Sequence, residues 1–166
     1  MDSNNFKFEL FEYRHIEEVR KIYNHYVKHT SVSFDIEEAS SEKIEHMFIH
    51  DNASFCSYVL LHEDSVIGYV SLSPFIKKHG SIHTAEVSVY LQPAASGQGL
   101  GSHLLNFIEQ KAEQFQFHTL IAVVCTENSA STKLFERAGY KLQGILTEVA
   151  YKFDRYLNAA YYQKHL

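Results

Sequence analysis

Cysteine is scarce in this sequence of 166 residues, which contains only Cys56 and Cys125. Neither belongs to a CxxC pair, which favours two reduced thiols in the core over disulfide or metal chemistry. No apolar stretch reaches the roughly 18 residues that a membrane span requires, and residues 1–30 contain no apolar signal core. We therefore expect a cytoplasmic protein with no membrane partner.

Runs of basic residues are missing as well. The formal net charge is −5, and no basic stripe stands out, so nucleic acid is not an expected partner. Histidines stand four residues apart in "HYVKH" and "HMFIH", which begin at His25 and His46. Neither segment has the intervening glutamate or an evident third ligand for zinc, so we expect no metal site.

The length and the balance of 45% hydrophobic and 21% charged residues indicate one soluble domain, 1–166, with one core. Apolar spacing predicts a strand over 6–13, two strands within 57–74 joined by a tight turn at 62–65, and further strands over 84–91 and 118–125. It also predicts helices over about 15–29, 42–49, 100–115 and 128–139, and a closing hairpin over 140–166. This order of elements predicts an α/β fold built on a mixed sheet.

The strand "TAEVSVYL" alternates cleanly between two kinds of side chain. Ala85, Val87, Val89 and Leu91 share one face, while Thr84, Glu86, Ser88 and Tyr90 share the other. A polar face on a central strand indicates a solvent-filled cleft beside that strand and not a packed core. Glu86 is therefore a candidate acid or base.

The segment "AASGQGLGSHLL" places Gly97, Gly99 and Gly101 between that strand and a predicted helix. Glycines allow positive φ and can turn successive N–H groups toward one point, and the helix N-terminus adds its dipole. No lysine or arginine stands between Pro93 and Gln110, so backbone amides alone would hold an anion there. A diphosphate suits such a site.

Two familiar phosphate-binding motifs do not fit this loop. A P-loop needs GK[ST], and "GLGS" has no lysine; a dinucleotide fingerprint beginning at Gly97 would need its third glycine at Ser102. The loop instead resembles the Q/R-x-x-G-x-G/A signature of the GNAT superfamily of N-acetyltransferases, whose last two small residues correspond to Gly99 and Gly101.

Segments outside the loop extend this resemblance. Residues 84–144 are similar to that superfamily in the order of their motifs. More narrowly, "IYNHYVKHTSVSFD", "TAEVSVYL" and "AYKFDRYLNAAYYQKHL" resemble the phosphinothricin acetyltransferase branch. The resemblance implies a single-domain GNAT fold, with a mixed, mostly antiparallel sheet whose central strands splay apart between flanking helices. It also implies a homodimer, to which "AAYYQ" would contribute.

The implied activity is transfer of acetyl from acetyl-CoA to the amino group of a small amino-acid-like substrate, such as phosphinothricin or methionine sulfoximine, by direct attack in a ternary complex. Glu86 matches the family's proposed base. Phe34, Ser88, Tyr151 and Phe153 would contact the acceptor. The residues that would bind acetyl-CoA lie in three segments of the chain. They are Val89, Tyr90, Leu91, Ser96, Gly97, Gln98, Gly99, Leu100, Gly101, Ser102, Asn128, Ser131 and Lys133. Lys133 or Arg137 could meet the 3′-phosphate, although an ordinary solvated helix face is the favoured interpretation of either residue.

The sequence departs from the branch pattern at several positions. Ser96 occupies the Gln/Arg position of the signature, Phe135 stands where relatives carry a proton-donating His or Tyr, and Asn158 replaces an Asp. The loop 76–83 lacks the branch's aromatic pattern. Acetylation of another amine (a polyamine, an aminoglycoside or a protein N-terminus) and a non-catalytic acyl-CoA-binding module are therefore alternative functions.

Overall fold

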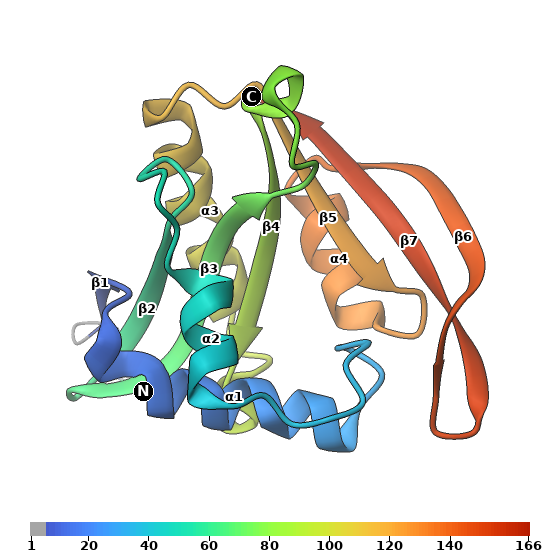
Figure 1. Cartoon of the computed structure of the whole chain (residues 1–166), viewed down its shortest axis with the longest axis horizontal. Helices are drawn as coiled ribbons and strands as arrows, with labels where there is room; N and C mark the ends of the chain where they lie inside the picture. The colour runs from blue at the N-terminus through green and yellow to red at the C-terminus, as the bar shows by residue number, and fades with distance from the viewer. Residues whose placement is uncertain (1–5) are drawn as a thin grey trace.

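The computed structural model describes residues 6–166, which form one seven-stranded sheet with helices on both of its faces (Figure 1). The strand order is β1-β2-β3-β4-β5-β7-β6, and every neighbouring pair is antiparallel except β4 with β5. The elements are β1 (Phe6–Leu10), α1 (Ile16–His29), α2 (Ser41–Phe48), β2 (Ser57–His62), β3 (Ser65–Pro74), β4 (Thr84–Leu91), α3 (Leu100–Gln114), β5 (Thr119–Cys125), α4 (Ser129–Arg137), β6 (Lys141–Lys152) and β7 (Arg155–His165). The α/β fold with a mixed, mostly antiparallel sheet is confirmed.

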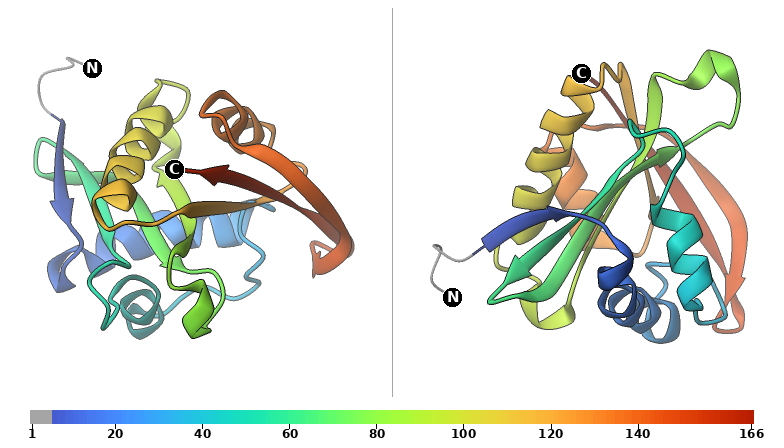
Figure 2. Two further views of the ribbon diagram at one scale, coloured as in Figure 1. Left: turned by 90° about the horizontal axis from the view of Figure 1, so that it is seen from above. Right: turned by 60° about the vertical axis from the view of Figure 1, so that its left-hand side comes forward.

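Helices α1 and α2 cover one face of the sheet, and α3 and α4 lie on the other (Figure 2). The apolar stripe of α1, including Val19, Ile22 and Val27, packs with Ile44 of α2 in one buried cluster. On the opposite face, Leu104 and its neighbours along α3 join a second cluster. Strand β2 is apolar on both faces, because Val59 and Leu61 join the first cluster and Leu60 joins the second.

The parallel pairing of β4 with β5 is short. Only Thr84, Ala85 and Glu86 have register partners on β5, and the last of these is Ile121. Beyond Glu86 the two strands diverge, so the β5-facing edge of β4 has no strand partner over residues 87–91. The splayed central strands implied by the family resemblance are therefore present.

The C-terminal hairpin of β6 and β7 twists away from the body of the sheet (Figure 1). The register of β6 shifts between Leu146 and Ala150, where Glu148 takes a φ of 56° and its N–H donates to Asn158 Oδ1 at 2.8 Å. Such a bulge increases the local twist. Asn158 thus has a structural partner within the hairpin.

One expectation needs correction. The first strand ends at Leu10 rather than residue 13, because Tyr13–His15 form a 3₁₀ turn in which His15 Nδ1 accepts the Glu12 N–H at 3.0 Å. "AAYYQ" lies in β7, between β5 and β6. Both cysteines are free and buried, as expected.

No helix in the described range 6–166 is long and apolar enough to cross a membrane.

Candidate active site

The glycine loop leads directly into the N-terminus of α3. Gly97 and Gly99 have φ values of 78° and 80°, which side-chain-bearing residues rarely adopt. Within the described structure, a β-carbon added at either glycine would meet no heavy atom within 4 Å. The loop is therefore open above its backbone, and the first N–H groups of α3, which lack intrahelical acceptors, face a site that an anion can approach.

A groove of about 450 Å³ lies over this loop, between α3 and α4. Every residue expected to bind the cosubstrate lines it, apart from Gln98 and Leu100. The Gln98 side chain donates to the Ala94 carbonyl at 3.0 Å, and the Leu100 side chain is buried in the core. The expected lining residues are Val89, Tyr90, Leu91, Ser96, Gly97, Gly99, Gly101, Ser102, Asn128, Ser131 and Lys133.

The groove also contains residues that the sequence did not single out for binding. Tyr26 of α1 reaches across to donate its hydroxyl to the Leu91 carbonyl at 2.7 Å. Val32 lies in the loop after α1. Arg137, the expected alternative to Lys133 for contact with the 3′-phosphate, also lines the groove on α4. Tyr26 could have been suspected from its place on the apolar stripe of α1, but no sequence pattern pairs it with Leu91.

A small cavity of about 40 Å³ occupies the split between β4 and β5. Asn128 caps α4 there, with its Oδ1 accepting the Ser131 N–H at 3.1 Å and its Nδ2 donating to Ser131 Oγ at 2.7 Å. Phe135 closes the same cavity and packs edge-on against Tyr140. Because Phe135 is apolar, α4 presents no acid at this position.

A third cavity, of about 250 Å³, surrounds Glu86 on the face that α1 and α2 cover. Its floor is two paired strands: Tyr69, Ser71 and Ser73 of β3 stand directly opposite Tyr90, Ser88 and Glu86 of β4. Tyr23 of α1 with Met47 and Phe48 of α2 completes the lining. We call this the Glu86 cavity.

The Glu86 carboxylate has the environment of a base. Burial raises its pKa above the ordinary range. Across residues 6–166 no hydrogen bond or ion pair reaches its oxygens. An unpaired carboxylate with a raised pKa can accept a proton from a ligand because no protein partner competes for it.

The wall around Tyr23 is held by a polar network. Tyr23 donates to Asp35 Oδ2 at 2.5 Å, and Asp35 also accepts Lys43 Nζ at 2.6 Å. Lys152, only 4% exposed, reaches from the C-terminal hairpin to donate to the Ser33 carbonyl at 2.8 Å. The loop after α1 is thereby fixed between the Glu86 cavity and the hairpin.

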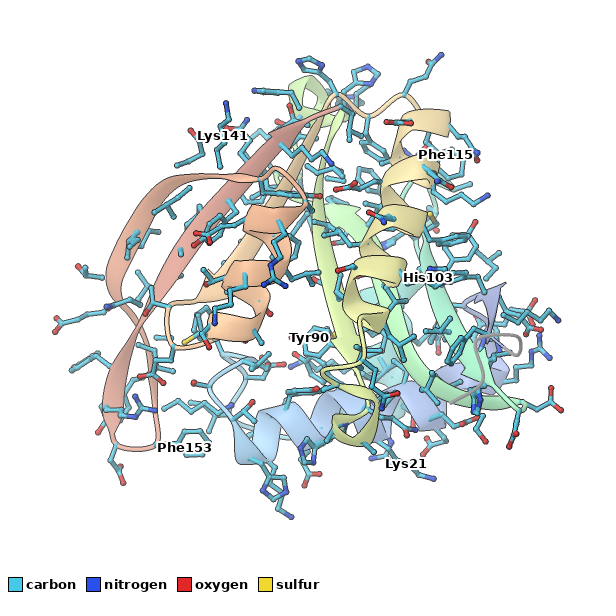
Figure 3. All side chains as sticks on the ribbon, turned by 180° about the vertical axis from the view of Figure 1, so that it is seen from behind. Lys21, Tyr90, His103, Phe115, Lys141 and Phe153 are labelled. Atoms are coloured by element: carbon cyan, nitrogen blue, oxygen red, sulfur yellow. The ribbon has the colours of Figure 1, made fainter. Side chains whose placement is uncertain are left out.

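Three of the four residues expected to contact the acceptor lie outside the Glu86 cavity. Only Ser88 lines it. Tyr151 is half exposed on β6, and Phe153 stands at the hairpin tip, away from Tyr90 (Figure 3). Phe34 is half buried in the loop after α1. Tyr69, Ser71 and Ser73, which do line the cavity, were missed although "GYVSLSP" alternates them on one face.

Tyr90 connects the three cavities, because it lines the groove, the split and the Glu86 cavity. The arrangement provides a loop open to an anion, a gap between strands and a half-buried carboxylate along one path. These features fit a transferase whose donor carries phosphate groups.

Comparison with known proteins agrees with this class. Residues 17–140 match the Acetyltransferase (GNAT) family. The chain belongs to the GNAT family of acetyltransferases, and it is an N-acetyltransferase.

Several relatives resemble it over most of their length. It is 30% identical to a phosphinothricin N-acetyltransferase of Streptomyces coelicolor, over 87% of either chain. It is 29% identical to an L-methionine sulfoximine/L-methionine sulfone acetyltransferase of Salmonella typhimurium, over 89% of this chain and 87% of that one. The crystal structure of a phosphinothricin acetyltransferase from Sinorhizobium meliloti in complex with AcCoA superposes with a TM-score of 0.91, at 25% identity, over 98% of this chain and 89% of that one.

Proposed function

We propose that this enzyme transfers the acetyl group of acetyl-CoA to the amino group of a small amino-acid-like acceptor, of the class that includes phosphinothricin and methionine sulfoximine. The observation that carries the proposal is the Glu86 cavity, in which an unpaired, half-buried carboxylate lies beside the split between β4 and β5. Its volume of about 250 Å³ suits a free amino acid better than a protein terminus or a polyamine.

The residues of the groove fit acetyl-CoA, which supplies the activated acetyl group as a thioester. The positive φ of Gly97 and Gly99 leaves the loop amides open for the pyrophosphate. Lys133 and Arg137 line the outer groove and offer charge for a further phosphate. The unpartnered backbone edge of β4 near Val89 can bond to the pantetheine arm and polarise the carbonyl to be attacked.

Glu86 acts as the base in this proposal. The amino group of a free amine or amino acid is mostly protonated at neutral pH and cannot attack until it loses a proton. Glu86 takes that proton, directly or through one water, as the nitrogen forms its bond to the acetyl carbon. The carbon–sulfur bond breaks in the same transfer.

The departing sulfur must gain a proton, and solvent is the proposed source. Phe135 has no proton to give. Burial raises the pKa of the Tyr90 hydroxyl far above its ordinary value, so this phenol holds its proton and serves only as a hydrogen-bond donor. Because a thiol is weakly acidic, its thiolate can leave without help from a protein acid and then take a proton from water.

A homodimer is also part of the proposal. β6 is the edge strand of the sheet, and its apolar side chains are about half exposed in the single chain: Leu142, Ile145, Leu146, Val149 and Tyr151. An exposed apolar edge strand favours pairing with a second copy.

Release of free thiol from acetyl-CoA, measured against a panel of amines, tests the proposal. Phosphinothricin, methionine sulfoximine and methionine sulfone should support turnover, and spermidine, an aminoglycoside and a short peptide should not. Glu86→Gln should lower turnover by roughly 10²-fold or more while acetyl-CoA still binds. Glu113→Gln, on the exposed face of α3, is the matched control and should keep the full rate. Binding of acetyl-CoA without turnover of any amine would instead indicate a non-catalytic module.

A further inference from the structure

The tip of the β6–β7 hairpin is attached to the loop after α1 at two points. Lys152 and Arg155 stand opposite each other in the last register pair before the turn. Lys152 Nζ donates to the Ser33 carbonyl at 2.8 Å. Arg155 pairs with Glu127, and Glu127 also accepts the Ser31 hydroxyl at 2.9 Å. The hairpin tip therefore holds one short segment of this loop from two sides.

The two contacts differ in burial. The Arg155–Glu127 pair is exposed to solvent, and such pairs contribute little to stability. Lys152 is 4% exposed, and within residues 6–166 its ammonium has one hydrogen-bond acceptor, the Ser33 carbonyl. Burial also lowers the pKa of this ammonium. An ammonium has three N–H donors, so its burial with one acceptor has a cost that a methionine of similar length would avoid. Stability alone does not account for a lysine at this position.

Ser33 connects the Lys152 contact to the Glu86 cavity. Its hydroxyl donates to the Tyr23 oxygen at 3.2 Å and accepts the Asp35 N–H at 3.2 Å. Tyr23 lines the Glu86 cavity and donates to Asp35 Oδ2 at 2.5 Å. Ser33 is buried, so water does not compete for these bonds. A displacement of Ser33 would therefore move the Tyr23 ring, which forms one wall of the cavity.

We propose, resting on the function proposed above, that Lys152 is a positioning residue for the acceptor. Through Ser33 it holds the Tyr23 wall of the Glu86 cavity in the place that aligns the amine with the acetyl group. The C-terminal hairpin thereby takes part in catalysis, although none of its described residues lines the Glu86 cavity. Small misplacements of a nucleophile slow its reaction strongly, so loss of this contact should impair use of the amine more than binding of the coenzyme.

Lys152→Met tests this at saturating acetyl-CoA, with the amine of the panel that the parent enzyme turns over fastest. We expect the KM for that amine to rise and its kcat/KM to fall by roughly tenfold or more. The affinity for acetyl-CoA, measured by calorimetry, should change little. Lys141→Met, at an exposed lysine at the other end of β6, is the matched control and should keep all three values.

Three outcomes would contradict the proposal. An unchanged kcat/KM in a Lys152→Met enzyme that binds acetyl-CoA would overturn this inference and leave the proposed function intact. An equal loss of acetyl-CoA affinity and of kcat/KM would show that Lys152 has only a structural role. No turnover of any amine by the parent enzyme would contradict the proposed function and, with it, this inference.

A second experiment tests the path through Ser33. Ser33→Ala removes the hydroxyl that joins the Lys152 contact to Tyr23. This variant alone should also raise the KM for the amine, so it tests the proposal even if Lys152→Met does not fold. In the double variant, Lys152→Met should lower kcat/KM by a smaller factor than in the parent enzyme, because residues on one path are not additive. If the two factors simply multiplied, Lys152 would not act through Ser33.

Discussion

At the scale of single residues, the carboxylate of Glu86 sets the expected dependence of activity on pH. Burial raises the pKa of Glu86, and in the proposed function the ionised form is the base. Activity should therefore be present above this raised pKa and be lost as the pH falls through it, at a higher pH than an exposed glutamate would give. A pH profile of kcat/KM tests this. If Glu86→Gln showed the same loss of kcat/KM at low pH, that loss would come from the titration of another group.

Gly99 has a conformational role and, in the proposed function, a binding role. Its φ of 80° and the open space above it predict that Gly99→Val strains the loop and obstructs the anion site, without a clash against the protein. We expect acetyl-CoA affinity to fall by an order of magnitude or more, as measured by calorimetry. Gly80→Val is the control, because this loop glycine has open space around it and no positive φ. Unchanged affinity in Gly99→Val would show that the loop is only a turn and does not bind acetyl-CoA.

Sequence patterns identified about half of the site at this scale. Alternation along β4 identified Glu86 and Ser88, and the glycine spacing identified the groove. Tyr69, Ser71 and Ser73 were missed because alternation gives the face of a strand and not its neighbour. The register that sets Ser73 against Glu86 depends on pairing between strands, which local periodicity does not encode.

At the scale of elements, the close approach of β3 to β4 depends on Gly68. A β-carbon there would lie 2.6 Å from Leu91 Cδ2 and 2.8 Å from the Tyr90 carbonyl oxygen, and a backbone atom cannot yield easily. We expect Gly68→Ala to lower the free energy of unfolding by about 1–3 kcal/mol in urea denaturation. Gly144→Ala, a strand glycine with no atom nearby in the described structure, should change stability little. If Gly68→Ala and Gly144→Ala lowered the free energy of unfolding equally, the close contact at Gly68 would not be the cause.

The elements themselves were largely predictable. The apolar spacing of α1 and the alternation of β4 are strong periodic signals, and both elements form where expected. The strand predicted over 6–13 is shorter because the capping contact between Glu12 and His15 favours a 3₁₀ turn. The bulge at Glu148 was not predictable, since it depends on Asn158 from the partner strand.

At the scale of the whole molecule, the exposed edge of β6 predicts association. Ile145 is 49% exposed in the single chain, so Ile145→Lys should leave the monomer folded and prevent the proposed dimer. Light scattering after size exclusion should give the dimer mass for the parent protein and the monomer mass for the variant. Ile36→Lys, at a 71% exposed residue outside β6, should remain dimeric. A monomeric parent protein would contradict the proposal.

The short ladder between β4 and β5 also bears on the stability of the molecule. Within the sheet only three register pairs join β1–β4 to β5–β7, and the core cluster that both halves share provides the rest of the connection. In the proposed function the pantetheine arm bonds to the open edge of β4. Bound coenzyme would then stand in for a missing strand, and the folded state should melt at a higher temperature with it than without it.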